Sequence, residues 1–195
     1  MKFLTALLVL ISAQVFAVEI GETAPNFTLD GTKDHVSLSD YHGKIVVLEW
    51  LNHGCPFIRK HYDSKNMQTL QRKYTAKDIV WLSIISSAPG KQGHVDKKGV
   101  EKEMKENDSG ATHVLLDPTG KVGKLYEAKT TPHMYIISQK GELVYQGAID
   151  NRPDADQDSI ASAKNYVAEA LDQLLSKQKI KVAKTKAYGC QVKYQ

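Results

Sequence analysis

Cysteine is the residue type in this sequence best suited to covalent chemistry, and the chain has two, Cys55 and Cys190. Cys55 follows an apolar, β-branched run, residues 44–51, and a short turn that ends in Gly54. Pro56 then opens a segment with helical spacing, and proline suits the first helical position because the N–H it lacks would be unpaired there anyway. The sequence therefore predicts that a buried strand leads to Cys55 as the N-cap of a helix.

This position predicts an acidic thiol. The N-terminus of a helix carries partial positive charge, and Arg59, Lys60, His53 and His61 are close to Cys55 in sequence. Both features favour the thiolate, which is the nucleophilic form of cysteine. We expect Cys55 to act as a nucleophile and Arg59 to help stabilise its charge.

Cys190 is the second thiol. About ten residues separate it from the last predicted helix, and an extended chain covers about 3.3 Å per residue, so this segment can span roughly 30 Å and reach Cys55. A disulfide closing so long a loop would also stabilise the fold, by on the order of 5 kcal/mol. Two interpretations stay open: Cys190 resolves whatever Cys55 forms, or the pair is a structural disulfide.

The N-terminus has the features of a secretory signal. Lys2 supplies the positive end, residues 3–11 the apolar stretch, and Ala17 ends a small-residue cleavage site. The alternative is a membrane anchor, which needs roughly 20 apolar residues. We predict a signal peptide (1–17), one domain (18–177) and a lysine-rich tail carrying Cys190 (178–195). Export would place both cysteines in the periplasm or outside the cell, where disulfides persist, with no membrane partner after cleavage.

Composition argues against several other classes of protein. The 26 basic and 22 acidic residues give a net charge of only +4, and no dense basic patch is interleaved with aromatic residues, so we expect no nucleic-acid partner. The histidines lack ligand spacing with a cysteine partner, so we expect neither a metal nor another cofactor. The histidines considered are His53, His61, His94, His113 and His133.

The order of elements predicts the fold class. An Asp-Gly turn at Asp30-Gly31 indicates a β-hairpin near the N-terminus. We predict strands at 44–51, 78–86, 112–116, 130–138 and 143–147, and helices at 56–74, 97–107, 118–126 and 158–177. This α/β order predicts a mixed central sheet with helices on both faces and the hairpin as an N-terminal extension.

Cys55 at a strand-to-helix junction, with Thr131-Pro132 before the last hairpin, resembles the thioredoxin fold. The resemblance is specifically to the redoxin branch that includes alkyl hydroperoxide reductase and thiol-specific antioxidant proteins, and it covers roughly residues 18–177. It implies that Thr131-Pro132 has a cis peptide bond and faces Cys55, although an ordinary turn is the alternative. Backbone beside such a proline can pair with an extended substrate strand.

The resemblance also concerns Glu49, six residues before Cys55, where thioredoxins have a buried carboxylate. It implies a partly buried base with a raised pKa, and the alternative is a carboxylate that pairs with a lysine at the edge of the sheet. Two features depart from the related families. Ile58 replaces the second cysteine of thioredoxins, and Leu48 and Asn52 stand where peroxiredoxins have Pro and Thr.

The resemblance implies an exported thiol-disulfide oxidoreductase that acts in cell redox homeostasis. The alternatives are a peroxiredoxin-like peroxidase that reduces hydroperoxides and a binding module with a structural disulfide. The expected partners are a thiol or disulfide protein or a small peroxide, together with an electron donor that the sequence does not identify. The expected catalytic residues are Cys55, Cys190 and Glu49, and the expected substrate-binding residues are Asn52, Pro56, Arg59, Thr131 and Pro132.

Overall fold

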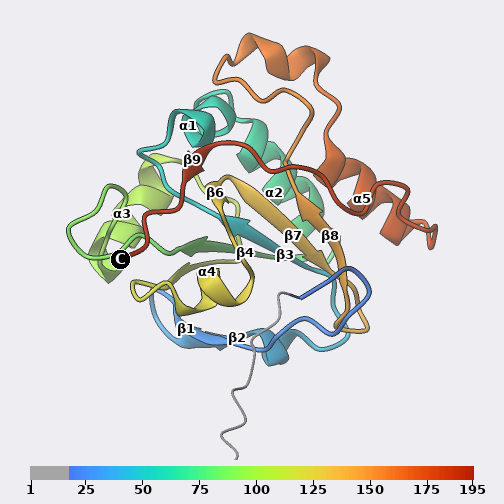
Figure 1. Cartoon of the computed structure of the whole chain (residues 1–195), viewed down its shortest axis with the longest axis horizontal. Coiled ribbons are helices and arrows are strands. Elements are labelled where there is room, and N and C mark those ends of the chain that lie inside the picture. Colours follow the sequence, from blue (N-terminus) through green and yellow to red (C-terminus); the bar gives the residue numbers. More distant parts are fainter. Residues whose placement is uncertain (1–17) are drawn as a thin grey trace, which may run out of the picture.

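The structure, a computed structural model, describes residues 18–195. The predicted signal peptide, residues 1–17, lies outside the described residues. Seven strands form one sheet in the order β2-β1-β5-β4-β3-β7-β8, and β6 and β9 form a separate pair (Figure 1). The strands are β1 (Thr28–Asp30), β2 (His35–Ser37), β3 (Val46–Trp50), β4 (Val80–Ile85), β5 (His113–Leu116), β6 (Thr130–Thr131), β7 (His133–Ile137), β8 (Leu143–Gly147) and β9 (Cys190–Gln191). The helices are α1 (Pro56–Asp63), α2 (Asn66–Thr75), α3 (Lys97–Glu106), α4 (Lys121–Leu125) and α5 (Tyr166–Leu175), with 3-10 turns η1 (Leu38–Tyr41) and η2 (Asp158–Ser162).

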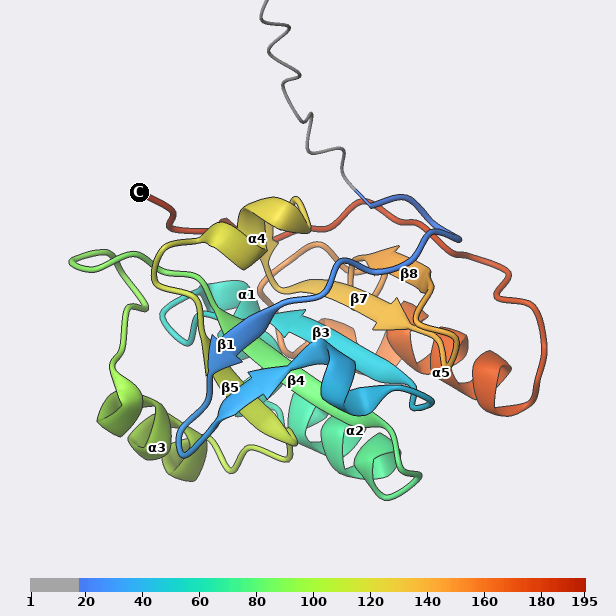
Figure 2. The ribbon, with the colours of Figure 1, turned by 90° about the horizontal axis from the view of Figure 1, so that it is seen from below.

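The sheet is mixed and is covered on both faces, which confirms the predicted architecture. β3 runs parallel to β4 and antiparallel to β7. Ile58 of α1, Met67 of α2 and Leu171 of α5 share one buried cluster, whereas Val122 of α4 belongs to a second cluster with Trp50. Figure 2 shows α2 and α4 on opposite sides of the sheet. The predicted N-terminal hairpin is present as β1 and β2 and joins the sheet beside β5.

The central strand β3 positions the residues that precede Cys55. All five of its residues are buried, as expected for an apolar strand covered on both faces. Side chains alternate along a strand, so Val46, Leu48 and Trp50 enter one core while Val47 enters the other. Glu49 therefore points to the face that α1 and α2 cover.

The predicted helix 56–74 is wrong as a single element. The chain forms α1 and α2, separated at Lys65, whose φ of 61° is left-handed. The Ser64 hydroxyl donates to the Lys60 carbonyl at 2.6 Å and so competes with continued helical bonding at this point. The break changes the direction of the chain between the two helices.

The predicted helix 158–177 is wrong in its first half. Asn165 is the N-cap of α5, and its side chain accepts a hydrogen bond from the backbone N–H of Ala168 at 2.8 Å. Asparagine is a strong N-cap, so the helix begins there. The residues near Asp158 form only the 3-10 turn η2. In the part of the chain that the structure describes, no helix has the length and apolar character needed to cross a membrane.

The C-terminal segment, residues 178–195, is packed along the domain. The backbone N–H of Thr185 donates to Gln146 in β8 at 3.0 Å, and the segment then forms β9 beside β6 (Figure 1). Beyond β9, the N–H of Ala88 donates to the Lys193 carbonyl at 2.9 Å. This path carries Cys190 across the end of the sheet where Cys55 lies.

Candidate active site

Cys55 is the N-cap of α1, with an extended backbone (φ −87°, ψ 126°), and Pro56 follows at the first helical position. This confirms the predicted position. The Cys55 side chain is fully buried. The Cys55 thiol donates to the Thr131 carbonyl oxygen at 3.1 Å.

The Thr131–Pro132 peptide bond is cis, as the resemblance implied, and the Thr131 backbone faces Cys55. The same short stretch of backbone is paired with β9. Thr131 lies opposite Cys190 and Thr130 lies opposite Gln191 in antiparallel register. The edge at which we expected a substrate strand to pair therefore carries the chain's own C-terminal strand.

The structure brings the two cysteines together. Both are free thiols, and the Cys190 thiol is within hydrogen-bonding reach of the Cys55 sulfur. Cys190 is partly exposed, whereas Cys55 is buried. The reach predicted for the C-terminal segment is confirmed, since this segment brings Cys190 to the site by lying along the domain.

The two thiols have opposite acidities. Burial opposes ionisation of Cys55, but hydrogen bonds from the Cys190 thiol, from the backbone N–H groups of Ile58 and Cys190 and from the Thr131 side chain outweigh burial and lower the pKa of Cys55. Burial and the neighbouring Cys55 raise the pKa of Cys190 to about 11. The environment of the pair therefore favours ionisation of Cys55 before Cys190, and the thiolate is the reactive form of cysteine.

The cationic residues near Cys55 in sequence do not supply this acidity, and that part of the prediction is wrong. Arg59 is directed to Asp63, one helical turn later, with an N–O distance of 3.0 Å. Burial lowers the pKa of His53 and of His61 to about 4, so neither carries charge near neutral pH. The groups that lower the pKa of Cys55 are hydrogen-bond donors: Cys190 and Thr131, which are distant in sequence, and Ile58 in the first turn of α1.

Glu49 is completely buried, more deeply than the partly buried base that we predicted. Burial raises the pKa of Glu49, and four neutral donors partly offset this effect. Its carboxylate is 2.7 Å from the indole nitrogen of Trp81, and no lysine in the part of the chain that the structure describes bonds to it. Within residues 18–195, Glu49 has no hydrogen bond to either cysteine. The four donors are Trp81, Ser83, Tyr62 and Gln71.

Asn52 and Pro56 flank the turn that carries Cys55. Asn52 is buried; its side-chain oxygen accepts from the Gly54 N–H at 2.9 Å and its amide donates to the Gln92 carbonyl at 3.3 Å. The Gln92 side chain donates in return to the Gly54 carbonyl at 2.9 Å. Asn52 therefore joins the Cys55 turn to the loop around Gln92, whereas Pro56 is exposed beside Cys55.

Sequence reasoning missed Tyr188 and the loop around Gln92. Tyr188 lies two residues before Cys190, and its ring centroid is 5.9 Å from that of Phe57, two residues after Cys55. In an extended strand, residues two apart share a face, so the spacing of Tyr188 and Cys190 was a usable signal. No such signal exists for Gln92, because only the folded chain brings that loop to Cys55. The described residues contain no cluster of three or more potential metal ligands.

The fold is similar to those of several solved structures. An uncharacterized conserved protein from Geobacillus kaustophilus has 25% identity and a TM-score of 0.76, over 91% of this chain and 93% of the other. A putative thiol:disulfide interchange protein DsbE from Chlorobium tepidum has 27% identity and a TM-score of 0.54, over 67% and 85%. An exposed lipoprotein thioredoxin from Streptococcus pneumoniae has 25% identity and a TM-score of 0.51, over 71% and 96%.

These neighbours confirm the thioredoxin-like fold. No curated protein matches the chain significantly. The AhpC/TSA family model matches residues 20–146, which is more than half of the chain and includes Cys55 and Thr131-Pro132. The chain belongs to the AhpC/TSA family and is a redoxin with a thioredoxin-like fold.

Proposed function

We propose that this protein is an exported thiol-disulfide oxidoreductase in which Cys55 is the nucleophile and Cys190 the resolving thiol. One observation carries the proposal. Cys190 lies opposite Thr131, whose carbonyl contacts Cys55, and the two thiols have pKa values shifted in opposite directions. A lowered pKa suits the attacking sulfur, and a nearby protonated thiol suits a group that reacts second.

The reaction needs two exchanges. The Cys55 thiolate attacks one sulfur of a substrate disulfide, forms a mixed disulfide and releases the other sulfur as a thiolate. Cys190 then loses its proton and attacks the Cys55 sulfur, which forms the Cys55–Cys190 disulfide and releases the second substrate thiolate. The substrate gains two electrons and the protein loses two. An external thiol donor restores the pair by the reverse exchange.

Other residues have supporting roles in this proposal. Glu49 is the acid–base group, because burial raises its pKa toward the range where it can take up a proton. Asn52 shapes the turn before Cys55. The side chains of Pro56 and Arg59 are exposed, so a substrate can contact them. Thr131 and Pro132 shape the site opposite the thiol.

We also propose that the protein acts outside the cytoplasm. The supporting features are the signal-like residues 1–17, and the likeness to an interchange protein named DsbE and to an exposed lipoprotein thioredoxin. A pair of thiols that forms and breaks a disulfide suits an oxidising compartment, where disulfides persist.

The test is single-turnover exchange with oxidised glutathione. Reduced protein should release glutathione and form the Cys55–Cys190 disulfide, whereas Cys55→Ser should do neither. If Cys55→Ser reacted with oxidised glutathione at the native rate, Cys55 would not be the nucleophile.

Reaction with hydrogen peroxide separates this function from a peroxidase. Leu48 is buried in β3 and the Asn52 amide is engaged by the Gly54 turn, so neither supplies the peroxide contacts that Pro and Thr give in peroxiredoxins. We expect the protein to consume hydrogen peroxide slowly compared with its rate of disulfide exchange. Rapid, Cys55-dependent formation of a sulfenic acid would favour the peroxidase instead.

A further inference from the structure

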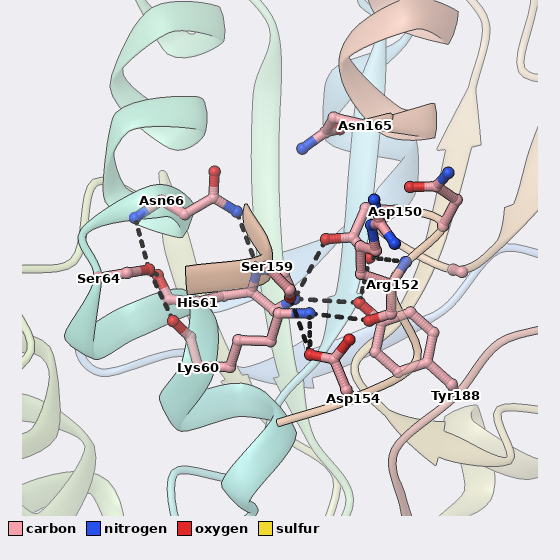
Figure 3. A network of polar contacts seen from close by, with 12 residues as sticks. Lys60, His61, Ser64, Asn66, Asp150, Arg152, Asp154, Ser159, Asn165 and Tyr188 are labelled. Atoms are coloured by element: carbon pink, nitrogen blue, oxygen red, sulfur yellow. Dashed lines mark hydrogen bonds and ion pairs between the residues drawn. The ribbon is translucent and has the colours of Figure 1, made fainter. Parts of the chain in front are cut away.

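A partly buried chain of hydrogen bonds reaches the C-terminal segment at Tyr188, two residues before Cys190 (Figure 3). The Tyr188 hydroxyl donates to Asp150 Oδ1 at 2.5 Å and lies 3.2 Å from His61 Nε2. On the other side of the ring, His61 Nδ1 lies 2.8 Å from the amide nitrogen of Asn66. The chain of contacts therefore runs from α2 through α1 to the segment that carries Cys190.

The donors and acceptors in this chain fit one assignment. The Asn66 amide can only donate through its nitrogen, so His61 Nδ1 accepts and the ring hydrogen is on Nε2. His61 Nε2 then donates to the Tyr188 oxygen, which leaves the hydroxyl hydrogen for Asp150. Burial lowers the pKa of His61 to about 4, so the neutral ring that this assignment needs is the form present near neutral pH.

The Tyr188 hydroxyl lies where water has little access. The His61 side chain is completely buried, and that of Asp150 is 2% exposed. Buried polar groups left without a partner are costly, so the hydroxyl is held more tightly than apolar packing alone would hold the ring. The ring itself lies near α1, with its centroid 5.9 Å from that of Phe57 and 5.8 Å from the Lys60 ammonium.

Contacts on the other side of Tyr188 fix the strand in register. Gly189 has a φ of 132°, and a Cβ there would clash with the Thr131 carbonyl oxygen, so the strand passes very close to β6. Beyond Cys190, the Val192 N–H donates to the Lys129 carbonyl at 3.0 Å. Cys190 is thus held between an anchor made by a side chain, Tyr188, and one made by backbone.

We propose that Tyr188 is a positioning residue, which holds Cys190 beside Cys55 because its hydroxyl is fixed by Asp150 and His61. This inference rests on the proposed function, since it concerns the step in which Cys190 reacts with Cys55. The hydroxyl acts through the placement of the strand and not on the reacting sulfurs. It ties Cys190 to α1, the helix that Cys55 caps, so the two thiols keep one relative position.

The direct test is Tyr188→Phe, which keeps the ring and removes the hydroxyl. The equilibrium constant for forming the Cys55–Cys190 disulfide in glutathione redox buffers should fall about tenfold. Without this hydrogen bond the strand holds Cys190 beside Cys55 for a smaller fraction of the time, and a hydrogen bond to a charged group has an effect of about this size. The lifetime of the mixed disulfide between Cys55 and glutathione should lengthen by a similar factor. In a Cys190→Ala background, which has no resolving thiol, Tyr188→Phe should leave the lifetime of the mixed disulfide unchanged.

Tyr74→Phe is the matched control. The Tyr74 hydroxyl also bonds a carboxylate, that of Asp172 at 3.0 Å, but this contact joins α2 to α5 away from the cysteines. Both variants should lose some thermal stability, and only Tyr188→Phe should change the disulfide equilibrium. Hydrogen exchange at the Val192 amide gives a readout independent of the chemistry, and it should be faster in Tyr188→Phe than in Tyr74→Phe.

Each outcome has a separate meaning. Lower stability in Tyr188→Phe, with an unchanged disulfide equilibrium and unchanged Val192 exchange, would overturn the positioning role and leave the proposed function standing. If the native chain forms no Cys55–Cys190 disulfide at any glutathione ratio, the proposed function fails and the inference fails with it. A shifted equilibrium together with faster Val192 exchange would support both.

Discussion

Cys190 lies directly opposite Thr131 in the β6–β9 pair, and the Thr131 carbonyl is the group that accepts the Cys55 thiol hydrogen bond at 3.1 Å. One residue of backbone thus contacts both cysteines. We expected a substrate strand to pair with the backbone beside the cis proline. The C-terminal strand of the protein itself pairs there instead. A protein substrate must displace that strand or approach Cys55 from another side.

The acidity of Cys55 should depend on the hydrogen bond from Cys190. Cys190→Ala removes the donor and should raise the pKa of Cys55, whereas Cys190→Ser keeps a hydroxyl donor and should raise it less. Ultraviolet titration of thiolate absorbance measures both variants without requiring access to the buried sulfur. Equal pKa values in the two variants would mean that Cys190 does not contribute through this bond.

Gly189→Ala should separate the C-terminal strand from β6. The added Cβ would clash with the Thr131 carbonyl oxygen. The clash and the unfavourable backbone conformation together cost roughly 1–3 kcal/mol, and the strand can relieve this cost by moving away from β6. Formation of the Cys55–Cys190 disulfide should slow about tenfold or more, and alkylation of Cys55, located by mass spectrometry, should accelerate.

Gly141→Ala is the matched control for this variant. Gly141 also has a positive φ, 79°, but nothing lies within 4 Å of the added Cβ. The control should therefore share the backbone strain without affecting the cysteines. Identical alkylation and disulfide rates in both variants would contradict the close pairing of β9 with β6.

The stability of the protein should fall in mild acid because of three histidines, two buried and one, His53, largely buried. Burial lowers the pKa of His53, His61 and His133 to about 4, whereas an unfolded chain has values near 6.5. Between those values the unfolded state binds more protons, so the free energy of unfolding decreases as the pH falls from about 6.5 to about 4.

Each of these histidines adds up to about 1.4 kcal/mol per pH unit in that window. Urea unfolding at a series of pH values measures the slope, and His133→Asn should make it shallower. A free energy of unfolding that stays constant through the window would show that these histidines titrate normally in the folded protein.

Glu49→Gln tests the buried carboxyl. Burial raises the pKa of Glu49 above the ordinary 4.5, so its contribution to stability is lost as the pH rises through the folded-state value. Glutamine does not ionise, so the stability of the variant relative to the native chain should improve as the pH rises above about 4.5. Disulfide exchange should slow at least about tenfold if Glu49 assists proton transfer.

An exposed glutamate on α5, Glu169, supplies the control as Glu169→Gln. Glu169→Gln should leave the exchange rate unchanged. An exchange rate in Glu49→Gln equal to that of the control would restrict Glu49 to a structural role in the core.

The position of Cys55 could be predicted because it follows from local rules. An apolar strand, a turn with Gly54 and a proline at the first helical position determine an N-cap without reference to the rest of the chain. The break at Lys65 and the start of α5 at Asn165 were missed because each depends on a single capping or turn residue within a longer apolar pattern.

The source of the Cys55 acidity could not be predicted in the same way. Sequence proximity suggested Arg59 and the histidines, but pairing with Asp63 engages Arg59 and burial keeps His53 and His61 neutral. Two of the four donors that act instead belong to Cys190 in β9, more than a hundred residues away in sequence, and a third belongs to Thr131. The fourth, the Ile58 N–H, lies in the first turn of α1 and follows from the predicted N-cap position. Long-range pairing of this kind has no periodic signature in the sequence.

The most direct measurement of the central claim is mass spectrometry of Cys190→Ser after reaction with oxidised glutathione, with a melting curve on the same sample. If Cys190 resolves the intermediate, a glutathione adduct should accumulate on Cys55 while the variant stays folded, and the native chain should show the Cys55–Cys190 disulfide instead. If the pair is a structural disulfide, the oxidised native chain should exceed the variant in stability by several kcal/mol, within the range of known disulfides, and no adduct should appear. A large loss of stability without a trapped adduct would contradict the resolving role of Cys190.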